Sequence, residues 1–260
     1  MPECATNSPR LVWRRVGDLV WKVRQPANRL VEAIVQEPEA FLRDPALFFK
    51  NSRVVTLSRV PSLEPKAPSL ILRRLNYGKW RHQLRDVFRA SRAERALSNG
   101  LLLESHGIST PRSWAAATRR SYRWPLRAYL ITEEVPGAVS LRAFAEEKSW
   151  LPAAIVSKLA QLLAQLHNAG FSHRDLKTTN ILMDGSGDLW LIDLDGIRVL
   201  GKISRERVVL DLSRLAADFV AKPGLLRRSG GRFLVEYARH RHPAANAREL
   251  GERIMARTVL

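Results

Sequence analysis

The sequence predicts an α+β fold in which strands are concentrated in the N-terminal half and helices in the C-terminal half. Strand-like alternation is concentrated in the N-terminal half, as in residues 48–60 and 69–75. Helical spacing of apolar residues prevails in the C-terminal half, most clearly over residues 151–169. A chain of 260 residues can bury a substantial core, and one domain with two lobes is as plausible as two domains.

The chain begins with an extension, residues 1–47, that carries no recognisable catalytic motif. Residues 11–23 are typical of a β-hairpin that turns at Gly17 and Asp18, and residues 30–35 are typical of a short helix. We expect the extension to belong to the N-terminal lobe.

The strands at 48–60 and 69–75 lead into a strongly basic stretch, residues 76–100, with a helical pattern. A helix over residues 92–105 is expected to end before Gly107. The basic stretch interleaves aromatic residues with arginines at helical spacing: Trp80, Arg81, Arg85, Phe88, Arg89, Arg92 and Arg95. Two interpretations stay open, a solvated helix face or a contact with an anionic membrane or phosphorylated sugar.

Residues 129–137 predict a strand that leads into the connection between the lobes. We therefore place the N-terminal lobe at residues 1–135 and the C-terminal lobe at residues 136–260. Helical patterns in the second lobe cover residues 151–169, 208–219, 233–240 and 244–260. Gly170 follows the first of these helices, at the position of a C-cap glycine.

The most informative stretch runs from His173 through Asn180 to Asp193, and a hairpin over residues 180–194 separates its two parts. Phosphoryl transfer needs a carboxylate that orients the acceptor hydroxyl and takes its proton, and Asp175 suits that role. Lys177 can offset charge on the transferred group, while Asn180 and Asp193 offer the oxygen ligands that Mg²⁺ prefers.

Neighbouring residues receive supporting roles. His173 and Arg174 are expected to brace the loop, and Asp211 is expected to lie near it on the following helix. Asp195 has two interpretations, a second metal contact or a polar turn residue before Gly196.

This order of helix, loop, hairpin and carboxylate resembles the catalytic region of protein-kinase-like phosphotransferases. The resemblance implies a bilobal protein-kinase-like fold, in which an N-terminal antiparallel sheet with one or more helices precedes a mainly helical C-terminal lobe. It also implies the use of ATP and Mg²⁺. It places Arg73 at the nucleotide phosphates and the backbone near Glu133 and Val135 at the adenine. Lys50 and Ser52 occupy the place of the glycine-rich loop, which this sequence lacks.

From about residue 48 to its C-terminus, the chain also resembles the lipopolysaccharide kinase family of bacterial Kdo and heptose kinases. The segments that carry this resemblance include Leu72–Asn76, Ser91–Asn99, Gly107–Pro111 and Leu191–Asp195. The resemblance implies a sugar hydroxyl of the lipopolysaccharide inner core, or of a similar anionic glycolipid, as acceptor at the cytoplasmic membrane face.

The sequence departs from the kinase pattern at two positions. Arg73 stands where a lysine is expected, and the two cations are not interchangeable because arginine presents a planar fork. Counting back from Gly107 places Ala96 where the lysine's glutamate partner is expected, with Glu94 as the nearest acid. A catalytically inactive binding module therefore stays open as an alternative.

An atypical, short protein kinase is the other alternative. Residues 197–260 contain no Ala-Pro-Glu triplet, which in protein kinases ends the segment that holds the peptide. This favours a saccharide acceptor over a protein.

The charge of the chain points to an anionic partner or surface. Lysine and arginine total 43 against 25 acidic residues, a net charge of +18. We expect a glycolipid or an acidic membrane surface in preference to nucleic acid, with a broadly solvated basic surface as the alternative. The sequence does not predict the oligomeric state.

Cys4 is the only cysteine, which excludes an internal disulfide. The first residues do not resemble a secretory signal, and no apolar run approaches the roughly 18 residues of a membrane span. We expect a cytoplasmic protein that can touch the inner membrane peripherally.

Overall fold

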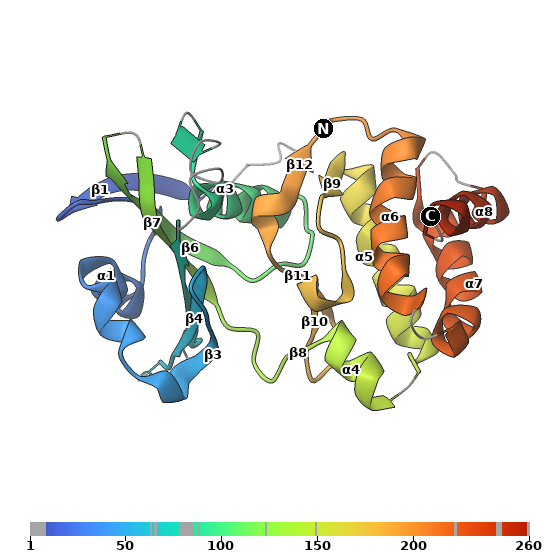
Figure 1. Ribbon diagram of the computed structural model, residues 1–260, viewed down its shortest axis with the longest axis horizontal. Coiled ribbons are helices and arrows are strands. Elements are labelled where there is room, and N and C mark those ends of the chain that lie inside the picture. The colour runs from blue at the N-terminus through green and yellow to red at the C-terminus, as the bar shows by residue number, and fades with distance from the viewer. Residues whose placement is uncertain are drawn as a thin grey trace, which may run out of the picture. The chain divides into compact units, whose positions relative to one another are not determined.

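The computed structural model describes residues 9–62, 64, 67–77, 86–87, 89–122, 124–148, 150–220, 223–242 and 246–258. The chain forms two compact units, and Figure 1 labels the helices and strands that belong to them. Unit 1 comprises Met1–Ser105 and Pro111–Glu134, and unit 2 comprises His106–Thr110 and Val135–Leu260.

Unit 1 is built on a seven-stranded sheet with the order β1-β2-β6-β7-β5-β4-β3. Its neighbouring strands pair antiparallel, as expected for strands joined by hairpins. The strands are β1 (Arg10–Val16), β2 (Leu19–Gln25), β3 (Phe48–Asn51), β4 (Val55–Val60), β5 (Leu70–Asn76), β6 (Ser113–Ser121) and β7 (Trp124–Glu133).

The N-terminal extension adds two strands and a helix to this sheet. β1 and β2 form the predicted hairpin, and β2 pairs with β6. The predicted short helix is α1 (Arg29–Gln36), whose N-terminus is capped by Asn28 through a 2.8 Å bond from the Val31 amide. Val31 and Ile34 join the buried side chains of the sheet, including Trp21, in one apolar core.

The opposite face of the sheet packs against α3 (Arg92–Ser105), which has the predicted bounds. A capping box starts this helix. The Ser91 hydroxyl accepts a 3.2 Å bond from the Glu94 amide, and the Glu94 carboxylate accepts a 2.7 Å bond from the Ser91 amide. The side chain of each residue therefore accepts a hydrogen bond from the backbone amide of the other at the start of the helix.

A single helix over residues 76–100 is wrong. Asn76 ends β5, and residues 89–91 are not helical but lead into the capping box of α3. The hydroxyl of Ser91 offers its own hydrogen bonds to the backbone, which favours a helix start there over a helix interior. Residues 78–85 and 88 of the basic stretch, which include Arg81 and Arg85, lie outside the described residues.

Helices make up most of unit 2, and α5 packs against α7 while α6 packs against α8. Their bounds are α4 (Leu141–Lys148), α5 (Ala153–Asn168), α6 (Arg205–Val220), α7 (Pro223–His240) and α8 (Ala247–Thr258). These confirm the four helical patterns with shifted ends and add α4, which the sequence did not predict. Within the described ranges, no helix has the length and apolar character needed to cross a bilayer.

Unit 2 also contains two small sheets, from which its loops extend. A three-stranded sheet has the order β11-β10-β8, with β8 (Val139–Ser140), β10 (Ile181–Met183) and β11 (Leu189–Leu191). β10 and β11 are the predicted hairpin. A separate pair consists of β9 (Phe171–His173) and β12 (Ile197–Val199).

Gly170 makes the turn from α5 into β9 possible. Its φ of +79° lies in the left-handed region, and a Cβ there would meet the carbonyl oxygen of Gly201 at 2.1 Å. The predicted C-cap glycine is therefore required both by backbone conformation and by space.

Candidate active site

The predicted base, cation and amide come together in one loop of unit 2, between β9 and β10. The Lys177 ammonium lies 2.6 Å from the Asp175 carboxylate. The side-chain amide of Asn180 donates to the backbone carbonyl of Asp175 at 2.8 Å and to its carboxylate at 3.3 Å. Because Asn180 uses its Nδ2 hydrogens in these bonds, its Oδ1 is the atom suited to a cation.

His173 braces this loop from beneath. Its side chain is fully buried, and its Nδ1 accepts a 3.2 Å bond from the Asp175 amide. The other ring nitrogen, Nε2, lies 3.2 Å from the Ile192 carbonyl and must therefore carry the proton. Burial lowers the pKa of His173, in agreement with a neutral ring.

The segment that carries Asp193 is hydrogen-bonded to the same loop. The Ile192 amide donates to the Asn180 carbonyl at 3.0 Å, and the Arg174 amide donates to the Gly196 carbonyl at 3.1 Å. Asp193 itself adopts a left-handed conformation with φ 60° and ψ 48°. Non-glycine residues adopt this region infrequently, and such residues are concentrated at functional sites.

The residue types of this loop and of Asp193 are compatible with a magnesium site that is completed by phosphate. Among the described residues, no group of three or more His, Cys, Asp or Glu side chains is placed to hold a metal ion. Mg²⁺ is commonly bound through one or two protein ligands together with substrate phosphates and water. One carboxylate, Asp193, and one amide oxygen, of Asn180, are compatible with that mode of binding.

Asp195 lies in the short 3₁₀ turn η4 (Leu194–Gly196) that follows Asp193. The turn keeps Gly196 close to the loop, since a Cβ there would lie 3.8 Å from the Asp175 amide nitrogen. Both interpretations of Asp195 therefore remain predictions.

Asp211 lies on α6 close to the loop, as predicted. Its carboxylate is fully buried and accepts a 3.1 Å bond from the His173 amide, and the Arg214 guanidinium lies 3.1 Å away. Burial opposes ionisation of Asp211, but the surrounding donors and cations, Arg207 among them, outweigh it and lower its pKa. A charged Asp211 thus fixes the backbone at the start of the loop.

Asp218 provides a second brace that sequence reasoning missed. Its carboxylate accepts bonds of 2.7 Å from both the amide and the hydroxyl of Thr178. Asp218 is seven residues after Asp211, so both project from one face of α6. That spacing was the available signal. Two carboxylates of one helix therefore hold the loop at both sides of Asp175.

The predicted nucleotide residues of unit 1 lie on its sheet. Arg73 is half-buried on β5 and pairs with Leu130 of β7, which pairs with Ala116 of β6. Thr118, two residues beyond Ala116, donates to Ser91 at the start of α3. Because side chains two apart on a strand share a face, Arg73 projects from the α3 face of the sheet.

Glu94, the acid nearest to the expected glutamate position, has other contacts. Besides closing the capping box, its carboxylate lies 3.9 Å from the Lys22 ammonium and 3.8 Å from the Arg120 guanidinium. Ala96 is buried. The assignment of Ala96 to the position of the helix partner remains a prediction.

The turn that occupies the place of the glycine-rich loop is held by Ser52. Its hydroxyl donates to the Val55 carbonyl at 3.0 Å and accepts from the Val55 amide at 3.1 Å. Lys50 is exposed on β3. Any contact of these side chains with phosphates remains a prediction.

The predicted adenine contacts fall at the end of β7. The Glu133 amide donates to the Arg112 carbonyl at 2.8 Å, and the Glu133 carboxylate accepts from the Trp114 indole at 3.1 Å. Val135 belongs to unit 2, where its carbonyl accepts a 3.2 Å bond from the Ala138 amide. The amide of Glu133 and the carbonyl of Val135 are therefore already used.

The fold and the braced loop define a protein-kinase-like protein. The profile of the lipopolysaccharide kinase (Kdo/WaaP) family matches residues 51–237. The chain belongs to this family, which confirms the resemblance seen in the sequence.

Curated relatives include 3-deoxy-D-manno-octulosonic acid kinases. That of Vibrio parahaemolyticus is 38% identical over 98 residues, covering 38% of this chain and 40% of the relative. That of Stenotrophomonas maltophilia is 35% identical over 144 residues, covering 54% and 53%. The matches thus span about half the length of these relatives, or less.

A more distant relative and a solved structure support the fold. The serine/threonine-protein kinase tricornered of Drosophila melanogaster is 28% identical over 117 residues, which cover 44% of this chain and 25% of that protein. A structure described as WaaP in complex with acyl carrier protein matches with a TM-score of 0.63 and 21% identity, covering 92% of this chain and 95% of that one. The predicted α+β kinase-like fold is confirmed.

Proposed function

We propose that the protein is an ATP- and Mg²⁺-dependent kinase that phosphorylates a sugar hydroxyl of the lipopolysaccharide inner core. The acceptor is Kdo, heptose or a sugar of a similar anionic glycolipid, reached at the cytoplasmic membrane face. The observation that carries this proposal is the loop in which Asp175, Lys177 and Asn180 converge. Membership of the lipopolysaccharide kinase family supports a sugar as acceptor.

Each residue of the loop has a defined task in this reaction. The Asp175 carboxylate orients the acceptor hydroxyl and takes its proton as the sugar oxygen bonds to the γ-phosphorus of ATP, while the bond from that phosphorus to the β,γ-bridging oxygen breaks and ADP leaves. Lys177, 2.6 Å from that carboxylate, offsets negative charge on the transferred group. Asn180 and Asp193 would hold Mg²⁺, which would neutralise charge on the nucleotide phosphates, and Arg73 of β5 is the residue that we assign to those phosphates.

The bracing contacts keep the solvent-exposed carboxylate of Asp175 in a position from which it can act as a base. The side chain of Asp175 is 55% exposed, so an acceptor can reach it. Its backbone is nevertheless fixed by His173 and Asn180, which bond its amide and its carbonyl. An exposed side chain on a fixed backbone suits a base that must meet a large glycolipid.

The acceptor class can be tested in cells and with the purified protein. Mass spectrometry of lipid-linked saccharide should show the loss of one phosphate when the protein is absent and its return when the gene is restored. The purified protein should transfer the γ-phosphate of ATP to lipid A-linked Kdo or heptose acceptors.

A protein kinase is the second candidate, favoured by the similarity to tricornered. It predicts label from ATP on the protein itself or on added proteins. Labelling of proteins without transfer to any lipid-linked saccharide would overturn the sugar-kinase proposal. Absence of phosphate transfer to both protein and lipid-linked saccharide would favour the third alternative, a catalytically inactive binding module.

A further inference from the structure

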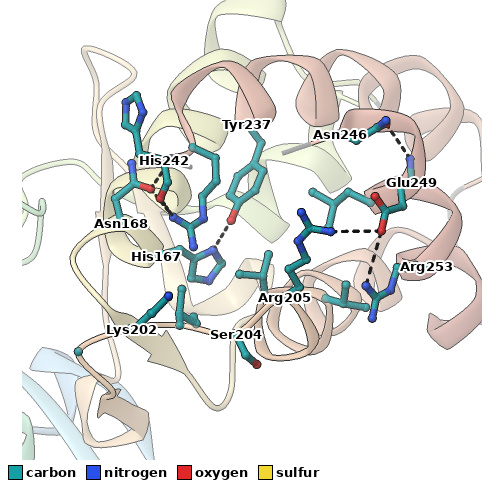
Figure 2. A pocket seen from close by; sticks show the side chains of 16 residues that line it. His167, Asn168, Lys202, Ser204, Arg205, Tyr237, His242, Asn246, Glu249 and Arg253 are labelled. Carbon is teal, nitrogen blue, oxygen red and sulfur yellow. Dashed lines mark hydrogen bonds and ion pairs between the residues drawn. The ribbon is translucent and has the colours of Figure 1, made fainter. Parts of the chain in front are cut away.

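A cavity of about 330 Å³ opens within unit 2. It forms where the C-terminal ends of α5 and α7 meet the N-terminal ends of α6 and α8 (Figure 2). Among the described residues that line it, none belongs to the loop that carries Asp175. Its volume lies at the lower end of the range for small-molecule sites, roughly 300–1,000 Å³.

The lining of this cavity is strongly cationic. Glu249 is the single carboxylate among the lining residues, and it lies 3.7 Å from Arg205 and 3.8 Å from Arg253. Glu206, outside the lining, also lies 3.4 Å from Arg253. Against these two acids, four cationic side chains line the cavity: Lys202, Arg205, Arg241 and Arg253. The cavity therefore keeps a net positive charge.

Two helix N-termini add to this charge. The Ser204 hydroxyl caps α6 by accepting a 3.2 Å bond from the Arg207 amide, and Asn246 caps α8 by accepting a 3.1 Å bond from the Glu249 amide. Both capping residues line the cavity. Helix N-termini carry partial positive charge and favour anions.

The floor of the cavity is already formed. His167 and Tyr237 are buried and joined by a 2.6 Å hydrogen bond, which is drawn as a dashed line in Figure 2. Asn168 accepts a 2.6 Å bond from the Arg241 guanidinium and a 2.9 Å bond from the His242 amide. Arg241 is therefore held in place, so a ligand need not order this side chain on binding.

One cation has no competing acid. Lys202 makes no ion pair within the part of the chain that the structure describes, and its side chain is exposed. Arginine forks and a lysine ammonium beside helix N-termini are the groups that bind phosphate in proteins.

We propose that this cavity binds the phosphate group of a phosphorylated ligand. The site is additional to the loop of Asp175, and its existence does not depend on the proposed kinase activity. The phosphate can belong to a soluble metabolite or to a lipid headgroup.

Calorimetric titration with pyrophosphate, in the absence of Mg²⁺, tests the site. The double variant Lys202→Glu/Arg205→Glu should bind at least about tenfold more weakly than the wild type. The control Arg198→Glu/Arg232→Glu makes the same change in charge at exposed positions that do not line the cavity, and should stay within about twofold. Circular dichroism checks that both variants fold, and Lys202→Ala provides a milder change.

Vesicles distinguish the two sources of phosphate. Phosphatidylcholine vesicles with and without phosphatidic acid are sedimented with each variant. If Lys202→Glu/Arg205→Glu loses binding to phosphatidic acid and the control variant does not, the ligand is a lipid phosphate. If Lys202→Glu/Arg205→Glu loses binding to pyrophosphate but not to phosphatidic acid, the ligand is a soluble phosphate. Absence of saturable binding, or equal loss in the control variant in both experiments, would overturn the proposal.

Discussion

At the residue scale, the neutral ring of His173 determines the shape of the loop. Its Nδ1 can accept the Asp175 amide only while that nitrogen lacks a proton, and burial keeps it so. A protonated ring would place two donors opposite each other. His173 thus supports the backbone of Asp175, which agrees with the bracing role expected from the sequence.

The roles of Asp193 and Asp195 can be distinguished by how each substitution changes the Mg²⁺ dependence of phosphate transfer. If Asp193 binds the ion, Asp193→Asn should raise the Mg²⁺ concentration for half-maximal phosphate transfer by at least about tenfold, because a charged ligand is lost. Asp195→Asn is the matched control and should change it by less than about threefold if Asp195 is a turn residue. The reverse order would move the metal site to Asp195.

At the element scale, α6 is the support of the active site. Asp211 and Asp218 lie two turns apart on this helix and bind the backbone on either side of Asp175. A shift of α6 would therefore displace the loop, even though neither carboxylate contacts the substrate in the proposed reaction. Both are positioning residues.

Removing the Asp218 brace should lower both stability and turnover. Asp218→Ala leaves the amide and hydroxyl of Thr178 without their acceptor, at a cost of about 2–3 kcal/mol in the free energy of unfolding. Asp218→Asn retains one acceptor oxygen and should cost less. Urea denaturation gives the stability, and steady-state kinetics should show a lower kcat with little change in the KM for ATP. An unchanged kcat in a folded Asp218→Ala variant would contradict the bracing role.

The capping box of α3 gives a prediction for Glu94. Glu94→Gln can still accept the Ser91 amide, so it should cost under about 0.5 kcal/mol, whereas Glu94→Ala should cost about 1 kcal/mol. Thermal or chemical denaturation measures both. If Glu94 instead served the nucleotide phosphates through Arg73, Glu94→Gln would lower transfer strongly while leaving stability intact.

Local sequence patterns predict a helix or strand correctly where the turn and capping residues that define its ends lie within or next to the element itself. The hairpin of β1 and β2 has a glycine turn, and α3 has a serine and a glutamate at its cap and a glycine after its end. β6 was missed because Ala115, Ala116 and Ala117 carry little strand propensity, and their burial in the sheet decides the outcome. β9 and β12 were missed because short paired strands depend on partners distant in sequence.

The active-site loop was predictable because its chemistry fixes residue types at fixed spacing. Asp175, Lys177 and Asn180 are close in sequence, and the structure brings them into contact. The contact between Asp218 and Thr178 spans 40 residues and depends on where α6 packs. The seven-residue spacing from Asp211 places Asp218 on the same helix face but does not identify Thr178 as its partner.

At the scale of the whole molecule, stability should depend on pH through buried histidines. Burial lowers the pKa of both His167 and His173 below the ordinary value near 6.5. Above that value both states of the protein hold neutral rings. Below it the unfolded chain binds protons that the folded chain does not, so the folded state loses stability as the pH falls.

Each buried histidine should remove up to about 1.4 kcal/mol of unfolding free energy per pH unit below about 6.5. Urea denaturation at pH 7.5 and 5.5 measures this slope. His167→Gln can still bond Tyr237 but does not titrate, so it should flatten the decline. The opposite sign, greater stability at pH 5.5, would show that these rings are charged in the folded state.

The net charge of +18 concerns association with partners and not the fold. Binding to anionic acceptors or membranes should therefore weaken with added salt, because exposed charges are screened within about 10 Å at 0.1 M ionic strength.

Single-turnover transfer of the γ-phosphate of ATP to a lipid-linked inner-core saccharide tests the central claim most directly. Asp175→Asn should slow transfer by about 10²–10⁴-fold because the base is lost. Asp188→Asn, an exposed carboxylate of the same unit that pairs with Lys158, should transfer at the wild-type rate. Wild-type transfer by a folded Asp175→Asn variant would contradict the account.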